Sequence, residues 1–336
     1  MDFFRALLEL LRTLFRPSAP PPTPPLPPTP PEPVGGIPAP VRRRVLMITF
    51  NPQFPAQGGQ RLTELLNWNP PENLASAFIS DIQSVSYGYL TYQIAERIVV
   101  DGLPAKIDGF IYTPEAYLEA LQRGQGHQPD TVDYTRLLTT FRILDKVRGR
   151  QIDEVWCFGG PYFGFYESVM AGPNAFFCNA PPLPNTQEAG RRFLIMGFNY
   201  QRGVGEMLEA FAHRAEFILS RVFQRTYGEA NLWERFTRYE KAHPGQAECG
   251  TVHYAPNSRT DYDWGNPTPV LSRCRNWRNF PDLSGPPQWV DCSEWGNGDM
   301  RLHHLWWLSL FPHITGQRDG IAYNWWQYVA DPNQVP

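Results

Sequence analysis

The chain has 336 residues, of which 42% are hydrophobic, so it can bury the core of one large domain or of two ordinary ones. Its net charge is −3 and its longest basic run is Arg42-Arg43-Arg44, so we expect no nucleic-acid partner. The five cysteines form no CxxC pair, which excludes a zinc ribbon and a thioredoxin-type redox motif.

The first part of the chain is predicted to be an amphipathic helix followed by a linker. Residues 2–16 place apolar side chains on one face and most of the Arg and Glu side chains on the other. This segment is too short and too charged to span a membrane, so we expect it to contact a membrane surface or a protein, or to act as a degenerate export signal. Residues 17–43, with thirteen prolines between positions 17 and 40, predict an extended linker.

Alternating strand and helix patterns predict an α/β domain at 44–228. Apolar or alternating runs predict strands at 44–50, 89–100 (a strand or a hairpin arm), 152–158 and 192–198. Helices are expected at 59–67 and 73–84, after the N-caps Thr113 and Asp133, and at 203–227. This order predicts a largely parallel sheet, Rossmann-like or flavodoxin-like, flanked by helices.

Residues 229–336 differ in composition and predict an irregular cap packed on the α/β domain. Nine of the eleven tryptophans lie here among Pro, Gly, Asn and Asp. Helices are expected only at 230–241, 299–311 and 320–329. Cys249, Cys274 and Cys292 also lie in this segment, where export would allow one disulfide, between Cys274 and Cys292.

The carboxyl ends of the predicted strands bring polar and aromatic residues to one edge of the sheet, where open α/β sheets bind ligands. A loop at 251–267, which also carries His253 and Asp261, is expected to reach over this crevice. The residues expected to bind substrate are Asn51, Tyr162, Glu167, Asn199, Tyr200 and Asp263. The alternative is that the Asn, Gly and Pro residues only form turns. The chain has no GxSxG, complete GxGxxG, Walker or HExxH motif, so we expect no nucleotide cofactor.

The helix at 203–227 carries a polar stripe of Glu206, Glu209, His213 and Glu216. At about 100° per residue these side chains share one face, opposite the apolar face that packs on the sheet. Glu209 and His213 are four residues apart and His213 and Glu216 three, spacings at which two side chains can bind one metal ion. Glu206 lies in the first turn and is predicted to be the general base. The alternative is that water covers the whole stripe.

Further ligands are expected from the helix at 299–311, because one helix supplies only two or three. This helix carries His303 and His304 in apolar surroundings, where imidazoles need a partner. We predict a site for zinc or another divalent metal, held by His213 with Glu216 or Glu209 and by His303 or His304. The alternative for His303 and His304 is a hydrogen bond to a backbone carbonyl in the core.

Three functions are consistent with these features. The first is a zinc-dependent hydrolase that acts on a glycan or peptide at a site between the helix at 203–227 and the histidine-bearing C-terminal helix. The second is a metal-free glycan hydrolase that uses Glu206 and Glu167. The third is a non-enzymatic exported module, structural or carbohydrate-binding. The linker, the tryptophan-rich cap and the presence of only three lysines favour an exported or cell-envelope location over the cytoplasm.

Overall fold

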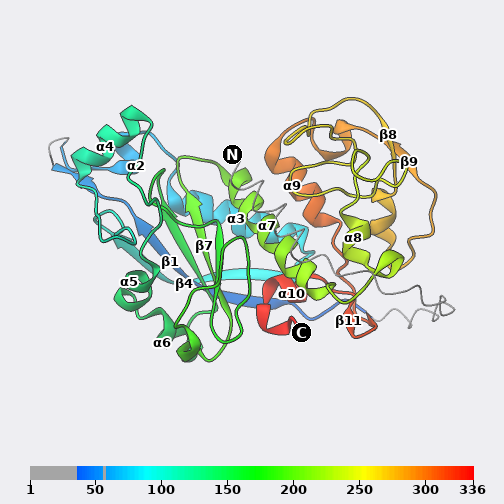
Figure 1. Ribbon diagram of the computed structural model, residues 1–336, viewed down its shortest axis with the longest axis horizontal. Coiled ribbons are helices and arrows are strands. Elements are labelled where there is room, and N and C mark those ends of the chain that lie inside the picture. Colours follow the sequence, from blue (N-terminus) through cyan, green and yellow to red (C-terminus); the bar gives the residue numbers. More distant parts are fainter. Residues whose placement is uncertain (1–35, 56–57) are drawn as a thin grey trace. The chain divides into compact units, whose positions relative to one another are not determined.

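The computed structural model of the chain describes residues 36–55 and 58–336 (Figure 1). The helix expected at 2–16 and the linker as far as residue 35 lie outside the described residues. Residues 41–43, which we assigned to the linker, instead begin the first strand. All described residues belong to one compact unit.

A five-stranded sheet in the order β4-β1-β5-β7-β6 forms the centre of this unit and confirms the predicted α/β fold. The first four strands in this order are parallel to their neighbours, and β6 is antiparallel to β7. β5 and the second half of β1 are buried along their whole length, as expected for strands covered on both faces. The strands are β1 (Val41–Phe50), β4 (Leu90–Val100), β5 (Glu154–Gly159), β6 (Ser168–Ala171) and β7 (Phe193–Asn199).

Helices cover both faces of the sheet. α3 and α7 pack side by side against it, and α5 and α6 lie on its other side (Figure 1). Thr113 and Asp133 cap α4 and α5 as predicted, accepting hydrogen bonds from the backbone N–H groups of Ala116 and Arg136. The helices up to this point are α2 (Leu62–Leu65), α3 (Pro71–Val85), α4 (Pro114–Arg123), α5 (Tyr134–Thr140), α6 (Ile143–Arg148) and α7 (Val204–Val222).

The C-terminal third contains short elements joined by long irregular stretches. Its helices are α8 (Leu232–Phe236), α9 (Met300–Ser309) and α10 (Trp326–Ala330). Paired short strands occur here and in the first third: β2 (Gln53–Phe54) with β3 (Gln60–Arg61), β8 (Val270–Ser272) with β9 (Gln288–Val290), and β10 (Gln317–Arg318) with β11 (Ile321–Ala322). Single turns of 3-10 helix lie at Gln187–Ala189, Gly228–Ala230, Cys274–Asn279, Cys292–Trp295 and Pro332–Gln334. Within the part of the chain that is described, no helix is long and apolar enough to cross a membrane.

Aromatic side chains fill the core of the C-terminal third and join it to α7. Neighbouring rings lie with centroids 4.9–6.2 Å apart in a cluster of Trp233, Phe236, Trp277, Trp307, Phe311 and Trp325. Phe223, which directly follows α7, packs edge-on against Trp325 at 5.4 Å. The chain therefore leaves the helix at Val222, five residues before the predicted end, and buries Phe223 among these rings.

Other predicted elements are shorter than the patterns indicated. The helix expected at 59–67 keeps only the four residues of α2, because the β2–β3 hairpin precedes it. The helix expected at 320–329 is reduced to α10, because the hairpin of β10 and β11 turns at Gly320, whose φ of 77° is left-handed. The segment 89–100 is a strand parallel to β1, not a hairpin arm.

The disulfide considered for Cys274 and Cys292 is not formed. All five cysteines lie within the described residues and are buried free thiols. The Cys292 thiol faces the side-chain oxygen of Asn297 at 3.6 Å, and the Cys249 thiol faces the carbonyl of Cys274 at 4.0 Å. The cap is therefore held together by aromatic packing, hydrogen bonds and ion pairs such as Arg235 with Glu248, and not by a disulfide.

A buried ion pair fixes the rotation of α7 on the sheet. The guanidinium of Arg214 donates to Glu154 Oε1 of β5 at 2.7 Å and to the carbonyl of Val329 in α10 at 2.7 Å. The indole N–H of Trp156 donates to the same carboxylate oxygen at 2.8 Å. Arg214 and Glu154 are almost completely inaccessible to solvent, so α7, β5 and α10 are tied together at one point. The adjacent residue, His213, is thereby turned away from the sheet.

Candidate metal centre

The polar stripe of α7 is covered by protein, not left to solvent. Glu209 is only 5% exposed, and His213 and Glu216 are partly buried. The covering segment is the loop at 251–267, which brings His253 and Tyr262 over the middle of the helix. The stripe is therefore the floor of an enclosed polar site.

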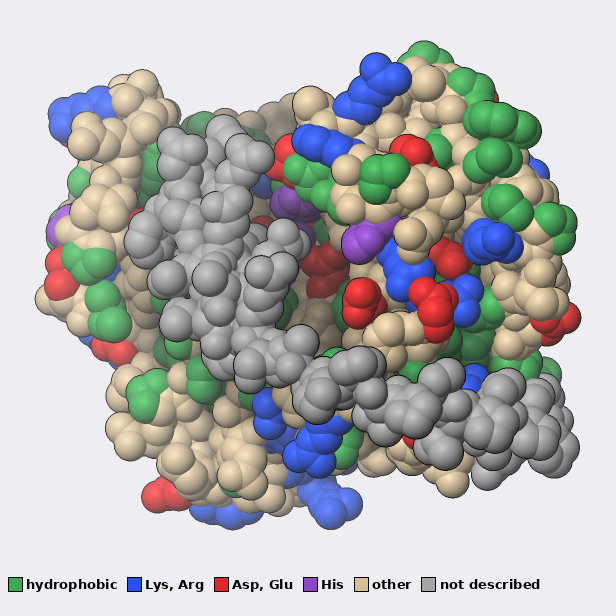
Figure 2. All heavy atoms as spheres, turned by 45° about the vertical axis from the view of Figure 1, so that its right-hand side comes forward, with side chains coloured by type: hydrophobic (Ala, Val, Ile, Leu, Met, Phe, Trp, Pro, Cys, Tyr) green, Lys and Arg blue, Asp and Glu red, His purple; other side chains and the backbone are tan. Residues whose placement is uncertain are grey.

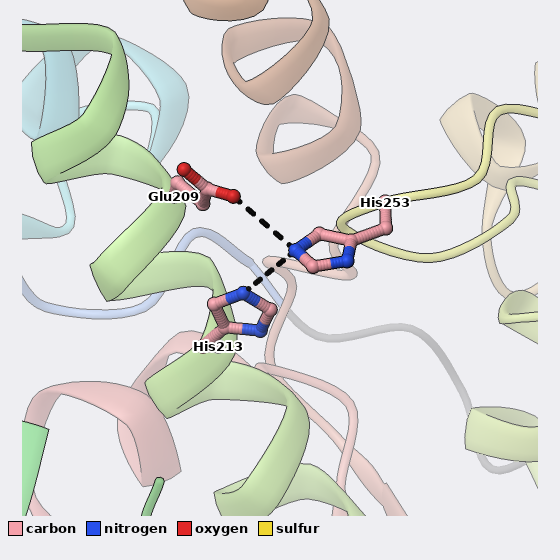
Figure 3. Close-up of side chains that lie close together, drawn as sticks. All are labelled: Glu209, His213 and His253. Carbon is pink, nitrogen blue, oxygen red and sulfur yellow. Dashed lines mark hydrogen bonds and ion pairs between the residues drawn. The ribbon is translucent and has the colours of Figure 1, made fainter. Parts of the chain in front are cut away.

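Three side chains converge within this site, two from α7 and one from the loop (Figure 3). His213 Nε2 lies 3.1 Å from His253 Nε2, and His253 Nε2 lies 3.2 Å from Glu209 Oε1. The three potential ligand atoms all lie within 4.8 Å of one another. A cluster of one carboxylate and two imidazoles in this arrangement can hold a metal ion.

A carboxylate supports each of the two histidines from the other side of its ring. His213 Nδ1 lies 3.0 Å from Glu216 Oε2, and the backbone N–H of Val252 donates to Glu216 Oε1 at 3.1 Å. His253 Nδ1 lies 3.1 Å from Asp261 Oδ1. These contacts assign a hydrogen to each Nδ1, so in the neutral imidazoles both Nε2 lone pairs point into the centre. Metal-binding histidines are typically held in this way by carboxylates.

Several lone pairs therefore lie close together in this centre, and a proton or a cation between them would stabilise the arrangement. Two Nε2 lone pairs and a carboxylate oxygen meet within a few ångströms, and one hydrogen cannot satisfy all three contacts of His253 Nε2. The donor set is therefore one that could hold a metal ion.

The pKa values of His213 and Glu209 are both shifted in the direction that favours the charged form of the side chain. Burial on its own would lower the pKa of His213, but the hydrogen bond and charge of Glu216, with Glu167 and Glu209, raise it to about 9. Burial on its own would raise the pKa of Glu209, but its contact with His253, the hydrogen bond from Tyr262 and the charge of His213 lower it to about 2. In the metal-free protein a proton on His213 supplies the charge that an ion would bring.

A cleft opens beside this cluster, at the carboxyl ends of β5 and β7 and the start of α7. Glu209 contributes to both the cleft and the cluster. Gly197 forms part of the wall, and a side chain there would meet the carbonyl of Tyr166 at 2.4 Å. In Figure 2, histidine and acidic side chains lie together in and beside a hollow of the surface. The cleft also has the position expected for a ligand crevice in an α/β sheet.

Three of the residues predicted to bind substrate line this cleft, namely Tyr162, Glu167 and Asn199. The other three have internal roles. The Asn51 amide donates to Thr63 Oγ1 at 3.0 Å, and the Tyr200 hydroxyl donates to the carbonyl of Phe50 at 2.9 Å.

Asp263 accepts a hydrogen bond from the backbone N–H of Arg259 at 2.9 Å. Its contribution is therefore to the shape of the loop that carries His253.

Glu206 lines the cleft, but its carboxylate is already engaged. Oε2 accepts a hydrogen bond from the N–H of Gly203 at 2.9 Å, and Oε1 pairs with Arg202 at 3.2 Å. These contacts direct the side chain toward the start of α7, whereas the three converging atoms lie one and two turns further along. The geometry leaves Glu206 as a helix cap at the cleft.

His303 and His304 lie next to the cluster, but outside it. Both rings pack against the indole of Trp264, at 4.8 and 5.1 Å between centroids. Among the described residues, no partner meets hydrogen-bond geometry at any of their four ring nitrogens, although a contact with the backbone of Val252 raises the pKa of His304. Burial lowers the pKa of His304 to about 4 and that of His303 well below its usual value. His253 thus takes the position in the ligand set that we predicted for His303 or His304.

Comparison of the chain with protein-family models, with curated proteins and with solved structures gives no match.

Proposed function

We propose that this protein is a metal-dependent hydrolase in which Glu209, His213 and His253 bind one divalent ion, zinc. The observation that carries the proposal is the convergence of two Nε2 atoms and one carboxylate oxygen, with a further carboxylate behind each imidazole. Three protein ligands leave one position open, which is typical of catalytic zinc. Such an ion, when bound, makes water acidic enough to attack at neutral pH and polarises a carbonyl.

The neighbouring residues provide the remaining functions of a hydrolytic site. Glu167 lies on the cleft wall, and its charge acts on both His213 and Tyr262. The Asn179 amide donates to Glu167 Oε2 at 2.6 Å and holds this carboxylate in place. We assign to Glu167, not to Glu206, the role of accepting a proton from the attacking water. A glycan or peptide would bind along the cleft, between the aromatic residues Tyr162 and Tyr166.

Two other functions make different use of the same residues. Two histidines and one carboxylate also hold iron(II) in oxygenases, so the identity of the ion separates a hydrolase from an oxygenase. A metal-free glycan hydrolase would use Glu167 and Glu206, which line one cleft. Glu206, however, is held by Gly203 and Arg202, away from the centre of the site.

The test is to measure metal content and hydrolysis on the same preparations of the full chain. Elemental analysis after dialysis is expected to give about one zinc per chain, with His213→Ala and Glu209→Gln losing it. Ester, peptide and glycoside substrates are then assayed with chelator and after zinc is restored. Glu234→Gln, at an exposed position in α8, is the matched control. Stoichiometric iron would favour the oxygenase, and hydrolysis that persists in chelator without metal would overturn the proposal.

A further inference from the structure

A fourth potential ligand atom, the hydroxyl oxygen of Tyr262, lies beside the three proposed ligand atoms. The hydroxyl of Tyr262 donates to Glu209 Oε1 at 2.6 Å and lies 3.1 Å from His253 Nε2. The second distance equals that between the two histidine Nε2 atoms. The phenol oxygen therefore lies beside two of the three proposed ligand atoms, hydrogen-bonded to one of them.

The backbone of the loop places Tyr262 at this position. Asp263 Oδ2 accepts hydrogen bonds from the Arg259 N–H at 2.9 Å and from the Asn266 amide at 3.1 Å, which closes the turn around residue 262. Tyr262 itself has a φ of 59°, a left-handed conformation that is unfavourable for a non-glycine residue. The loop keeps this unfavourable conformation and thereby aims the phenol at Glu209.

The Tyr262 side chain lies at the surface of the site. Tyr262 is 46% exposed, and its ring rests on the rings of His253 and Trp264, at 4.4 and 5.0 Å between centroids. No part of the aromatic core of the C-terminal third depends on it. Glu209 faces both the phenol and the cleft, so a ligand that arrives through the cleft meets the ion beside Tyr262.

We infer that the Tyr262 hydroxyl fills the fourth coordination position of the ion in the resting protein and is displaced by substrate. The inference rests on the proposed function, because it requires an ion at Glu209, His213 and His253. Once substrate in the cleft has displaced the phenol, the attacking water of the proposed function takes the vacated position. A tyrosine that is bound nine-tenths of the time lowers the apparent affinity of a competing ligand about tenfold.

The experiment uses cobalt(II), whose visible spectrum reports coordination, and azide as the competing ligand. Wild type and Tyr262→Phe are loaded with one cobalt ion per chain and titrated with azide. We expect a different spectrum for Tyr262→Phe before azide is added, and an azide affinity about tenfold higher than that of the wild type. Tyr227→Phe, at an exposed tyrosine outside the loop, is expected to match the wild type in both measurements.

The outcomes separate this inference from the proposed function. If the wild type does not bind cobalt, the protein has no such metal site and both proposals are wrong. Cobalt binding with the same spectrum and azide affinity in wild type and Tyr262→Phe overturns the role of Tyr262 and leaves the metal site in place. Tyr262→Gly, which suits the left-handed backbone and also lacks the phenol, should reproduce the result of Tyr262→Phe if the loop remains folded.

Discussion

Replacing His253 by alanine should abolish tight zinc binding and leave the fold intact. His253 supplies the one proposed ligand that does not come from α7, and its Nε2 atom makes both of the short contacts, at 3.1 and 3.2 Å. Without it the ion keeps only Glu209 and His213, four residues apart on one helix. A bound metal ion would then have no protein ligand from the loop at 251–267.

The expected loss of zinc affinity depends on whether a residue binds the ion directly or only supports a ligand. Loss of a carboxylate that only supports a metal-binding histidine costs about 10–100-fold in affinity. We therefore expect Asp261→Ala, which removes the support of His253 Nδ1, to fall in this range. His253→Ala should lose more than about 100-fold, or more than about 2.7 kcal/mol of binding free energy. His253 is a partly exposed loop residue, so the metal-free protein should lose less than about 1 kcal/mol of stability.

The assay is a zinc competition titration against a chromophoric chelator, with thermal unfolding of the metal-free proteins to confirm folding. His243→Ala, which changes a histidine outside the cluster, is the control. A His253→Ala protein that is folded and binds zinc within threefold of the wild-type affinity would refute the assigned ligand set.

Three further predictions address stability. Zinc at 100 times its dissociation constant should stabilise the wild type by about 2.7 kcal/mol, reversibly with chelator, and an unchanged unfolding curve would count against the site. His303 and His304 are neutral in the fold because burial lowers their pKa values, whereas the unfolded chain protonates them below about 6.5. Below pH 6.5, where His213 is protonated in both the folded and the unfolded chain, stability should therefore fall, by about 2 kcal/mol at pH 5 for each of these two histidines, and urea unfolding of His304→Gln should show a shallower decline than the wild type. Arg214→Met should cost about 3–5 kcal/mol because it leaves Glu154 buried without its partner, and pairing it with Glu154→Gln should recover part of this loss; a near-neutral single variant would contradict the role of the ion pair.

The sheet could be predicted from the sequence because its strands are distinctive. The runs at 44–50, 152–158 and 192–198 are short, apolar and bounded by turn residues, and each became a strand of the sheet. Helix ends were less predictable. Phe223 continues the helical pattern of α7 in sequence, but in the structure it packs against Trp325, a contact between residues about one hundred positions apart.

The residues of the candidate site could be predicted where they lie on one helix, but not where they lie on a loop. Helical spacing alone placed Glu209, His213 and Glu216 on one face, and the structure brings Glu209 and His213 into the cluster and Glu216 behind the His213 ring. The sequence also indicated that the loop at 251–267 could reach over a pocket, but no periodicity determines which loop residue meets a helix. His253 and Tyr262 reach the cluster through the fold of that loop, which Asp263 stabilises. His303 or His304 was predicted to be a metal ligand, but in the structure their helix turns both rings toward Trp264.

The central claim is that one divalent ion binds between α7 and the loop at 251–267. The most direct measurement is a crystal structure of the zinc-loaded protein with anomalous diffraction data collected on both sides of the zinc absorption edge. The metal centre predicts one strong zinc peak about 2.0–2.2 Å from Glu209 Oε1, His213 Nε2 and His253 Nε2. A fully loaded crystal with no peak there, in which the Nε2 atoms of His213 and His253 remain 3.1 Å apart, would contradict it.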